Sequence, residues 1–165
     1  MDPQSKPPRV GIVGIGHVAL HEHIPGIREA GGQVTALADT AGDTASKLAR
    51  ENGIAAAYTD YRELCADPNV DVVAICTPAG VHREIALAAI AAGKHVFMEK
   101  PPTTGAEPMR EVADAAREAN RILLAGSHHP YRENVTWLRD HIASGQLGDV
   151  YAVDCFKLRR DHAPL

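Results

Sequence analysis

The sequence predicts an α/β domain built on a doubly wound, mostly parallel sheet. Short apolar segments alternate with helical segments through most of the 165 residues, and glycine or proline closes many of them. Strands that are covered on both faces have continuous apolar sequences, and the helices between them supply the crossovers that parallel strands need. The alternation therefore predicts a parallel sheet with helices on both faces.

The first half of the chain supplies two strands and three helical segments. Residues 9–14 (RVGIVG) form an apolar run that ends in glycine, which predicts a buried strand, and residues 17–30 follow as a helix that Gly31 ends. Residues 34–39 (VTALAD) predict the second strand. Residues 43–52 predict a helix that ends before Gly53, and residues 61–66 predict a short helical segment.

The second half repeats the alternation. Residues 70–76 (VDVVAIC) are apolar and β-branched and are followed by Thr77-Pro78, so they predict a strand with a sharp end. Residues 81–92 are alanine-rich and predict a helix, and residues 95–98 (HVFM) predict a strand. A helix over 106–120 and a strand over 121–125 complete the domain.

Three regions follow from this pattern. Residues 1–8 are polar and proline-bearing and predict a disordered tail, and residues 9–127 make up the α/β domain. Residues 128–165 predict a linking helix over 133–144 and a strand over 149–157, which would begin a second α+β domain. A single strand cannot bury a core, so we expect this last region to be a short stub.

Charge and cysteine content exclude several classes of protein. The 17 basic and 21 acidic residues give a net charge of -4 without any block of like charge, which argues against nucleic acid or an anionic membrane as a partner. Three scattered cysteines form no metal or disulfide spacing, which favours a reducing compartment. The N-terminal residues lack the apolar core of a signal peptide, and no later run reaches membrane-spanning length. We therefore expect a cytoplasmic protein.

Residues 14–19 (GIGHVA) join the first predicted strand to the first predicted helix and form a G-x-G-x-x-A variant of the dinucleotide-binding fingerprint. The first glycine permits the tight turn, the second lets the backbone approach a pyrophosphate, and the small Ala19 lets the helix pack on the strand. The amides after the second glycine lie at a helix N-terminus, which favours phosphate. The cofactor-binding residues predicted here are Gly14, Ile15, Gly16, His17 and Val18.

Asp39 ends the second predicted strand, where a carboxylate is expected to bind the ribose hydroxyls in the adenosine half of a dinucleotide. The alternative is that Asp39 is only a helix cap or a turn residue. Thr40 follows it, so no arginine is placed there to bind a 2′-phosphate. The pattern therefore favours NAD as the cofactor, with NADP as the alternative.

Further motifs follow in order along the chain. They are YTDYREL at 58–64, TPAGVH at 77–82, GKHV at 93–96, EKP at 99–101 and IASGQLG at 142–148. Together with the glycine loop, this series strongly resembles the Gfo/Idh/MocA family, the glucose-fructose oxidoreductase and inositol dehydrogenase group. The resemblance runs over residues 9–160, and the order and spacing of the motifs make it specific.

The resemblance implies a Rossmann domain and a further set of cofactor-binding residues. Thr77 and Pro78 would border the adenosine and ribose portion of the cofactor, with His82 nearby on the following helix. Glu99 and Lys100 would lie near the nicotinamide ribose, at the carboxyl end of a strand.

Lys100 is the predicted catalytic residue. By the resemblance, it steers or shuttles a proton at the substrate hydroxyl while hydride passes to the nicotinamide, and its bond to Pro101 is often cis in the family. Oxidation of an alcohol needs a proton acceptor beside the hydride acceptor, and an amine can serve. The alternative is an exposed lysine before a loop proline, which is the commonest kind of lysine.

The resemblance implies an NAD(P)-dependent dehydrogenase of a sugar, a polyol or a related alcohol, represented here by its nucleotide-binding half. Family members carry a second domain that supplies most of the substrate pocket, and this chain stops where that domain should begin. An alternative is a non-catalytic dinucleotide-binding or regulatory module, or a truncated inactive product. A further possibility is that the final predicted strand pairs with a second copy or a partner chain to form an oligomer.

The remaining histidines and cysteines predict no metal site. His17 and His21 share a helix face, as a metal-binding pair does, but no third ligand has suitable spacing. Solvated or phosphate-adjacent histidines are the preferred interpretation, and the same holds for His128 and His129. Cys76 ends a buried strand with no cation beside it in sequence, which favours packing over a nucleophile.

Overall fold

Two compact units make up the chain, Met1–Ser127 and His128–Leu165. The structure, a computed structural model, describes residues 6–154. Residues 1–5 of the expected tail and residues 155–157 of the expected last strand lie outside the described residues. Within the described part of the chain, no helix is long and apolar enough to cross a membrane.

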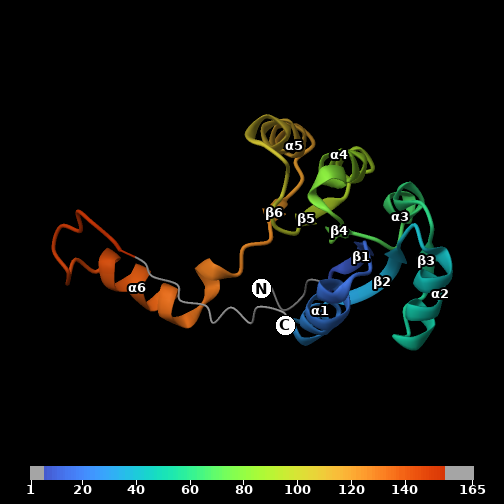
Figure 1. The fold of residues 1–165 in the computed structure, drawn as a ribbon, viewed down its shortest axis with the longest axis horizontal. Coiled ribbons are helices and arrows are strands. Elements are labelled where there is room, and N and C mark those ends of the chain that lie inside the picture. The colour runs from blue at the N-terminus through green and yellow to red at the C-terminus, as the bar shows by residue number, and fades with distance from the viewer. Residues whose placement is uncertain (1–5, 155–165) are drawn as a thin grey trace, which may run out of the picture. The chain divides into compact units, whose positions relative to one another are not determined.

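The first unit is built on one sheet whose six strands, in the described part of the chain, all run parallel (Figure 1). The strands are β1 (Arg9–Val13), β2 (Gln33–Ala38), β3 (Ala56–Tyr58), β4 (Val72–Ile75), β5 (His95–Met98) and β6 (Leu123–Ala125). Their order across the sheet is β3-β2-β1-β4-β5-β6, so the strand order reverses between β1 and β4. The predicted doubly wound α/β fold is confirmed.

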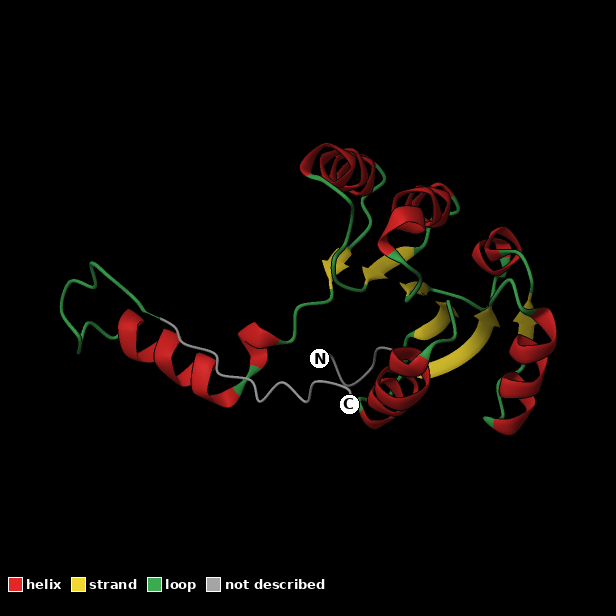
Figure 2. Ribbon diagram, in the orientation of Figure 1, coloured by secondary structure: helices red, strands yellow, loops and turns green. Residues whose placement is uncertain are grey.

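Helices cover both faces of this sheet (Figure 2). They are the π-helical turn η1 (Ala19–His23), α1 (Ile24–Glu29), α2 (Gly42–Glu51), α3 (Tyr61–Ala66), the 3-10 turn η2 (Ala79–Val81), α4 (His82–Ala91) and α5 (Ala106–Glu118). One apolar core packs α3, α4 and α5 against one face and includes Val13 of β1. A second core packs η1, α1 and α2 against the other and includes Ile12. Successive strand residues point to opposite faces, so the two cores lie on opposite faces of the sheet, each between the sheet and a layer of helices.

Two elements differ from the predicted pattern. The strand β3 is the short segment Ala56–Tyr58, which is too poor in β-branched residues to predict a strand. The turn η1 lies inside the helix predicted over 17–30 and is a π turn, in which the amide of Ile24 donates to the carbonyl of Ala19. This wide turn ends two residues before Pro25, which has no N–H to continue the α-helical ladder.

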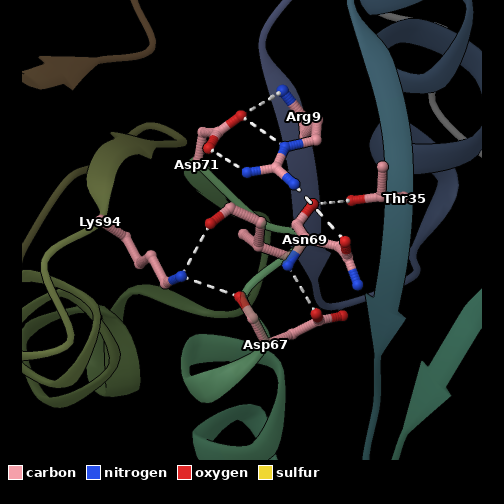
Figure 3. Close-up of polar contacts among 7 residues, drawn as sticks. Arg9, Thr35, Asp67, Asn69, Asp71 and Lys94 are labelled. Carbon is pink, nitrogen blue, oxygen red and sulfur yellow. Dashed lines mark hydrogen bonds and ion pairs between the residues drawn. The ribbon is translucent and has the colours of Figure 1, made fainter.

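A polar cluster ties together the amino ends of the central strands (Figure 3). Arg9, which begins β1, donates to both carboxylate oxygens of Asp71 at 2.9 and 2.7 Å. These hydrogen bonds lower the pKa of the Asp71 carboxyl to about 2. Lys94, just before β5, donates from Nζ to the carbonyls of Asp67 and Val70 at 2.8 and 2.7 Å. The cluster stabilises the amino end of the sheet, opposite to the carboxyl end where sheets of this kind bind ligands.

The second unit contains the 3-10 turn η3 (His129–Tyr131) and the helix α6 (Glu133–Ala143), close to the helix predicted over 133–144. The strand predicted over 149–157 is wrong for its described part, because residues 149–154 have no strand structure. A strand needs the backbone hydrogen bonds of a neighbour, and none of the described strands pairs with these residues.

Candidate functional site

A crevice of about 630 Å³ opens at the carboxyl ends of β1, β2 and β4. It lies where the strand order reverses, which is the position at which open α/β sheets bind ligands. Three segments far apart in sequence meet there: the glycine loop, the end of β2 and the end of β4. The predicted cofactor residues that line the crevice are Gly14, Ile15, Gly16, Asp39, Thr40, Thr77 and Pro78.

The two glycines of the loop have different physical roles. Gly14 has a φ of 89°, and a Cβ there would lie 2.8 Å from Thr77 Cγ2 and 2.9 Å from the backbone carbon of Cys76. At Gly16, a Cβ would meet no atom within 4 Å. The fold itself therefore requires the first glycine. Residues with a side chain rarely adopt that φ, and the turn at Cys76 and Thr77 leaves no room for a Cβ. The second glycine leaves open space for a ligand.

The carboxylate of Asp39 lies at this glycine turn. Its Oδ2 accepts a hydrogen bond from the amide of Ile15 at 2.9 Å, and its Oδ1 accepts one from the amide of Ala41 at 3.0 Å. The second bond is the turn interaction that the alternative interpretation anticipated. The first bond joins the end of β2 to the glycine loop, so the turn interaction accounts for only part of the geometry.

The groups around the crevice fit the adenosine diphosphate portion of a dinucleotide. Open space at Gly16 lies beside the amides that start the helical segment beginning at His17, and such amides bind phosphate oxygens. Asp39 provides an acceptor for ribose hydroxyls at the crevice wall. Thr77 Oγ1 is buried and has no hydrogen-bond partner among the described residues, so one polar atom of the wall is left for a ligand.

Other residues of the crevice were not singled out from the sequence. They come from the loop before α3, the start of α3, the end of η2 and the first turn of α4, and they are Thr59, Tyr61, Val81, Glu84 and Ile85. Burial raises the pKa of the Tyr61 phenol, and the charge of Glu84 raises it further. Two signals could have found them: the YTDYREL motif holds the first pair, and the others recur at helical spacing after the TP turn.

His82 does not line the crevice, although the resemblance placed it near the cofactor. Its side chain is buried in the first turn of α4, with the residue only 1% exposed. Its Nε2 lies 2.6 Å from the carbonyl oxygen of Thr77, and its Nδ1 lies 3.1 Å from that of Pro102. The ring therefore joins two backbone segments, the turn after β4 and the loop after β5. Because Thr77 lines the crevice, His82 supports the crevice wall without lining it.

Glu99 and Lys100 follow β5 and lie outside the residues that line the crevice. The bond between Lys100 and Pro101 is cis, as the resemblance implied. Lys100 is exposed, and its ammonium makes no hydrogen bond or ion pair that involves the described residues. The Glu99 carboxylate, by contrast, has partners: His23 Nε2 lies 2.9 Å from Oε1, and the Lys100 amide donates to Oε2 at 2.9 Å. Sequence reasoning missed His23.

The histidines after the glycine loop and Cys76 were the other candidates for metal binding or catalysis. His17 and Val18 begin the helical segment after the glycine loop but do not line the crevice. The rings of His17 and His21 lie 4.4 Å apart, and no group of three metal-ligating side chains exists within residues 6–154. Burial, with a smaller contribution from the charge of Glu99, raises the pKa of the Cys76 thiol to about 12. Cys76 is therefore a protonated thiol at neutral pH.

Comparison with known proteins agrees with this geometry. Residues 8–127 match the model of the GFO_IDH_MocA oxidoreductase family, described as an NAD-binding Rossmann fold. The chain is 40% identical over 150 residues to 1,5-anhydro-D-fructose reductase of Ensifer adhaerens, an alignment that covers 90% of this chain and 44% of that protein. It is 34% identical over 161 residues to D-glucoside 3-dehydrogenase of Escherichia coli, covering 97% of this chain and 46% of that protein.

A solved structure shares the same architecture. The WlbA dehydrogenase of Bordetella pertussis, in complex with NADH and UDP-GlcNAcA, superposes with a TM-score of 0.81 at 25% identity. The superposition covers 88% of this chain and 45% of that chain. The chain thus spans less than half the length of the relatives that it matches.

Proposed function

The chain belongs to the Gfo/Idh/MocA family of oxidoreductases, and on that premise we propose that it is the nucleotide-binding half of an NAD-dependent dehydrogenase. The proposed substrates are sugars, polyols or related alcohols, because the relatives include an anhydrofructose reductase and a glucoside dehydrogenase. The observation that carries the proposal is the hydrogen bond from Ile15 to Asp39 at the mouth of the crevice. It places a carboxylate beside open backbone at Gly16, an arrangement suited to a ribose next to a diphosphate.

In the proposed complex, the glycine loop holds the diphosphate through the amides that follow Gly16, including those of His17 and Val18. Asp39 accepts hydrogen bonds from the adenosine ribose, and Thr77 and Pro78 close the other side of the crevice. When bound, the nicotinamide supplies the hydride acceptor for alcohol oxidation. His82 supports the Thr77 carbonyl from behind.

Lys100 is the proposed proton acceptor. It lies exposed after β5, at the carboxyl edge of the same sheet, and its ammonium has no partner within residues 6–154 to hold it away from a substrate. In the proposed reaction, the substrate carbon loses hydride to the bound cofactor, and the hydroxyl proton passes to Lys100 Nζ, which accepts it as the neutral amine. Glu99 lies one residue before it and is held by His23.

NAD is the preferred cofactor over NADP. In the proposed complex, the Asp39 carboxylate would face the 2′-phosphate of NADP, and Thr40, which also lines the crevice, supplies no positive charge to neutralise that phosphate. Glu84 adds a second carboxylate to the crevice wall. We also propose a reducing, cytoplasmic location, which is supported by the scattered cysteines and, within residues 6–154, by the free thiols of Cys65 and Cys76.

Titration with NADH tests the proposal directly. We expect nicotinamide fluorescence to change on binding, and the melting temperature to rise with NADH concentration because a ligand that binds only the folded state stabilises it. NADPH at the same concentrations should give a smaller rise. Absence of any response at millimolar NADH would overturn the proposal, and an equal response to NADPH would overturn the cofactor preference.

A further inference from the structure

A side-chain pair that the proposed chemistry does not use joins the glycine loop's helical segment to the EKP segment. His23 is the last residue of the π turn η1, and Glu99 follows β5, 76 positions later in the chain. His23 Nε2 and Glu99 Oε1 lie 2.9 Å apart, and the two side chains are only 18% and 17% exposed. The His23 ring also packs edge-on against Phe97 of β5, with the ring centroids 5.2 Å apart. The His23 ring is therefore held on two sides.

Both oxygens of the Glu99 carboxylate have a partner. One faces His23, and the other accepts the backbone amide of Lys100 at 2.9 Å. The Glu99 amide in turn donates to the carbonyl of Ile75 at 2.9 Å, which anchors the segment to β4. A carboxylate with this set of bonds cannot rotate without breaking one of them, so the backbone at Lys100 is tied to η1 through a single side chain.

We propose that His23 is a positioning residue, which fixes Glu99 and through it the backbone of Lys100 relative to the helical segment that follows the glycine loop. This inference rests on the proposed function, since it assigns to the pair the placement of Lys100 relative to the loop that is proposed to bind the diphosphate. The pair differs from ordinary packing because it acts at a defined atom, the Lys100 amide. The other histidines near the loop, His17 and His21, are exposed and have no bond to Glu99.

Three variants separate this role from a general effect on folding. His23→Leu keeps the bulk of the side chain and removes the donor to Glu99. His23→Gln keeps a donor that can reach the same oxygen. His21→Leu is the matched control, because this exposed histidine lies in the same π turn and does not contact Glu99.

Two measurements are made on each variant of the 165-residue chain. The first is the position of the Lys100 amide resonance in a ¹H–¹⁵N spectrum without cofactor. The second is the dissociation constant for NADH compared with that for ADP, which contains the adenosine and the diphosphate but lacks the nicotinamide ribose. Loss of a hydrogen bond to a charged group corresponds to roughly a tenfold change in affinity.

For His23→Leu we expect a displaced Lys100 amide resonance and a dissociation constant for NADH that rises roughly tenfold, with ADP binding changed less than about twofold. His23→Gln should keep the Lys100 resonance and the dissociation constant for NADH close to those of the unmodified chain. His21→Leu should change neither the resonance nor the dissociation constant. If His23→Leu does not fold, Glu99→Gln is measured in its place, with the same expected direction.

An unmoved Lys100 resonance in His23→Leu would overturn the inference, and so would equal weakening of NADH and ADP, which indicates a merely structural role. If the unmodified chain binds neither nucleotide, the proposed function fails, and the Lys100 resonance alone then decides whether the pair positions that residue.

Discussion

Replacement of the two loop glycines by alanine separates what the fold requires from what the cofactor requires. At Gly14 the added methyl would be forced into a φ of 89° and would meet Thr77 Cγ2 at 2.8 Å and the Thr77 amide nitrogen at 2.9 Å. The backbone strain costs about 1–2 kcal/mol and the overpacking about 1–3 kcal/mol. Gly14→Ala should therefore lose roughly 2–5 kcal/mol, which lowers the melting temperature of a chain of this length by roughly 4–20 °C.

At Gly16 the same substitution should leave folding almost unchanged. The methyl meets no atom within 4 Å and the φ is outside the left-handed region, so the free energy of unfolding should change by less than about 1 kcal/mol. The methyl does occupy the space through which a diphosphate would approach the loop. Gly16→Ala should therefore raise the dissociation constant for NADH at least about tenfold, a loss of about 1.4 kcal/mol.

The assays are thermal unfolding and NADH fluorescence titration, applied to both variants and to Gly26→Ala. Gly26 lies in α1, and a Cβ there also meets nothing within 4 Å, so this control adds a methyl away from the crevice and should leave NADH binding unchanged. If Gly16→Ala binds NADH as tightly as the unmodified chain, the diphosphate does not approach the loop and the reasoning is wrong. A large loss of stability in Gly16→Ala would equally contradict it.

Three further predictions concern the crevice wall and the amino end of the sheet. Asp39→Asn should weaken NADH on the order of tenfold by removing a charged acceptor, and should weaken NADPH less; titration with both cofactors checks this, and unchanged NADH affinity would count against a ribose contact. Cys76, with a thiol pKa of about 12, should react slowly with iodoacetamide in the folded chain at pH 8, whereas rapid labelling would contradict its burial. Arg9→Met should lower the melting temperature at pH 7 by removing the partner of Asp71, whose pKa falls from 3.8 to about 2 in the folded chain. A depressed carboxyl pKa stabilises the fold above pH 3.8, so the difference should fade as the pH falls towards 2, and a difference that persists there would refute this origin. Both side chains are more than one-third exposed, so the effect at pH 7 should stay below about 1 kcal/mol.

The sequence predicted the features that depend on neighbours along the chain. The strands at residues 9–14 and 70–76, the glycine loop between strand and helix, and Asp39 at the end of the second strand each carry a local signature, and all lie where that signature places them. The short β3 carries none, because alanines form strands only when neighbouring strands supply the hydrogen bonds. The strand predicted over 149–157 fails in its described part for the same reason, since an apolar pattern alone supplies no partner.

Contacts between distant residues were beyond sequence reasoning. His23 and Glu99 are 76 positions apart, and only the packing of η1 beside the end of β5 brings them to 2.9 Å. His82 was placed near the cofactor by the TPAGVH motif, and the structure shows it buried behind the crevice wall. The EKP and TPAGVH motifs indicated Glu99 and His82 as residues of the site region, but only the fold shows which atoms their side chains contact.

Mapping of NADH onto the 165-residue chain by ¹H–¹⁵N chemical shifts shows whether the crevice at the glycine loop binds the dinucleotide. We expect the largest shifts on the amides of Ile15, Gly16, His17 and Val18, on Asp39 and on Thr77, with the Arg9–Asp71 end of the sheet unchanged. Shifts that instead cluster at the amino ends of the strands, or an unchanged spectrum at millimolar NADH, would contradict it.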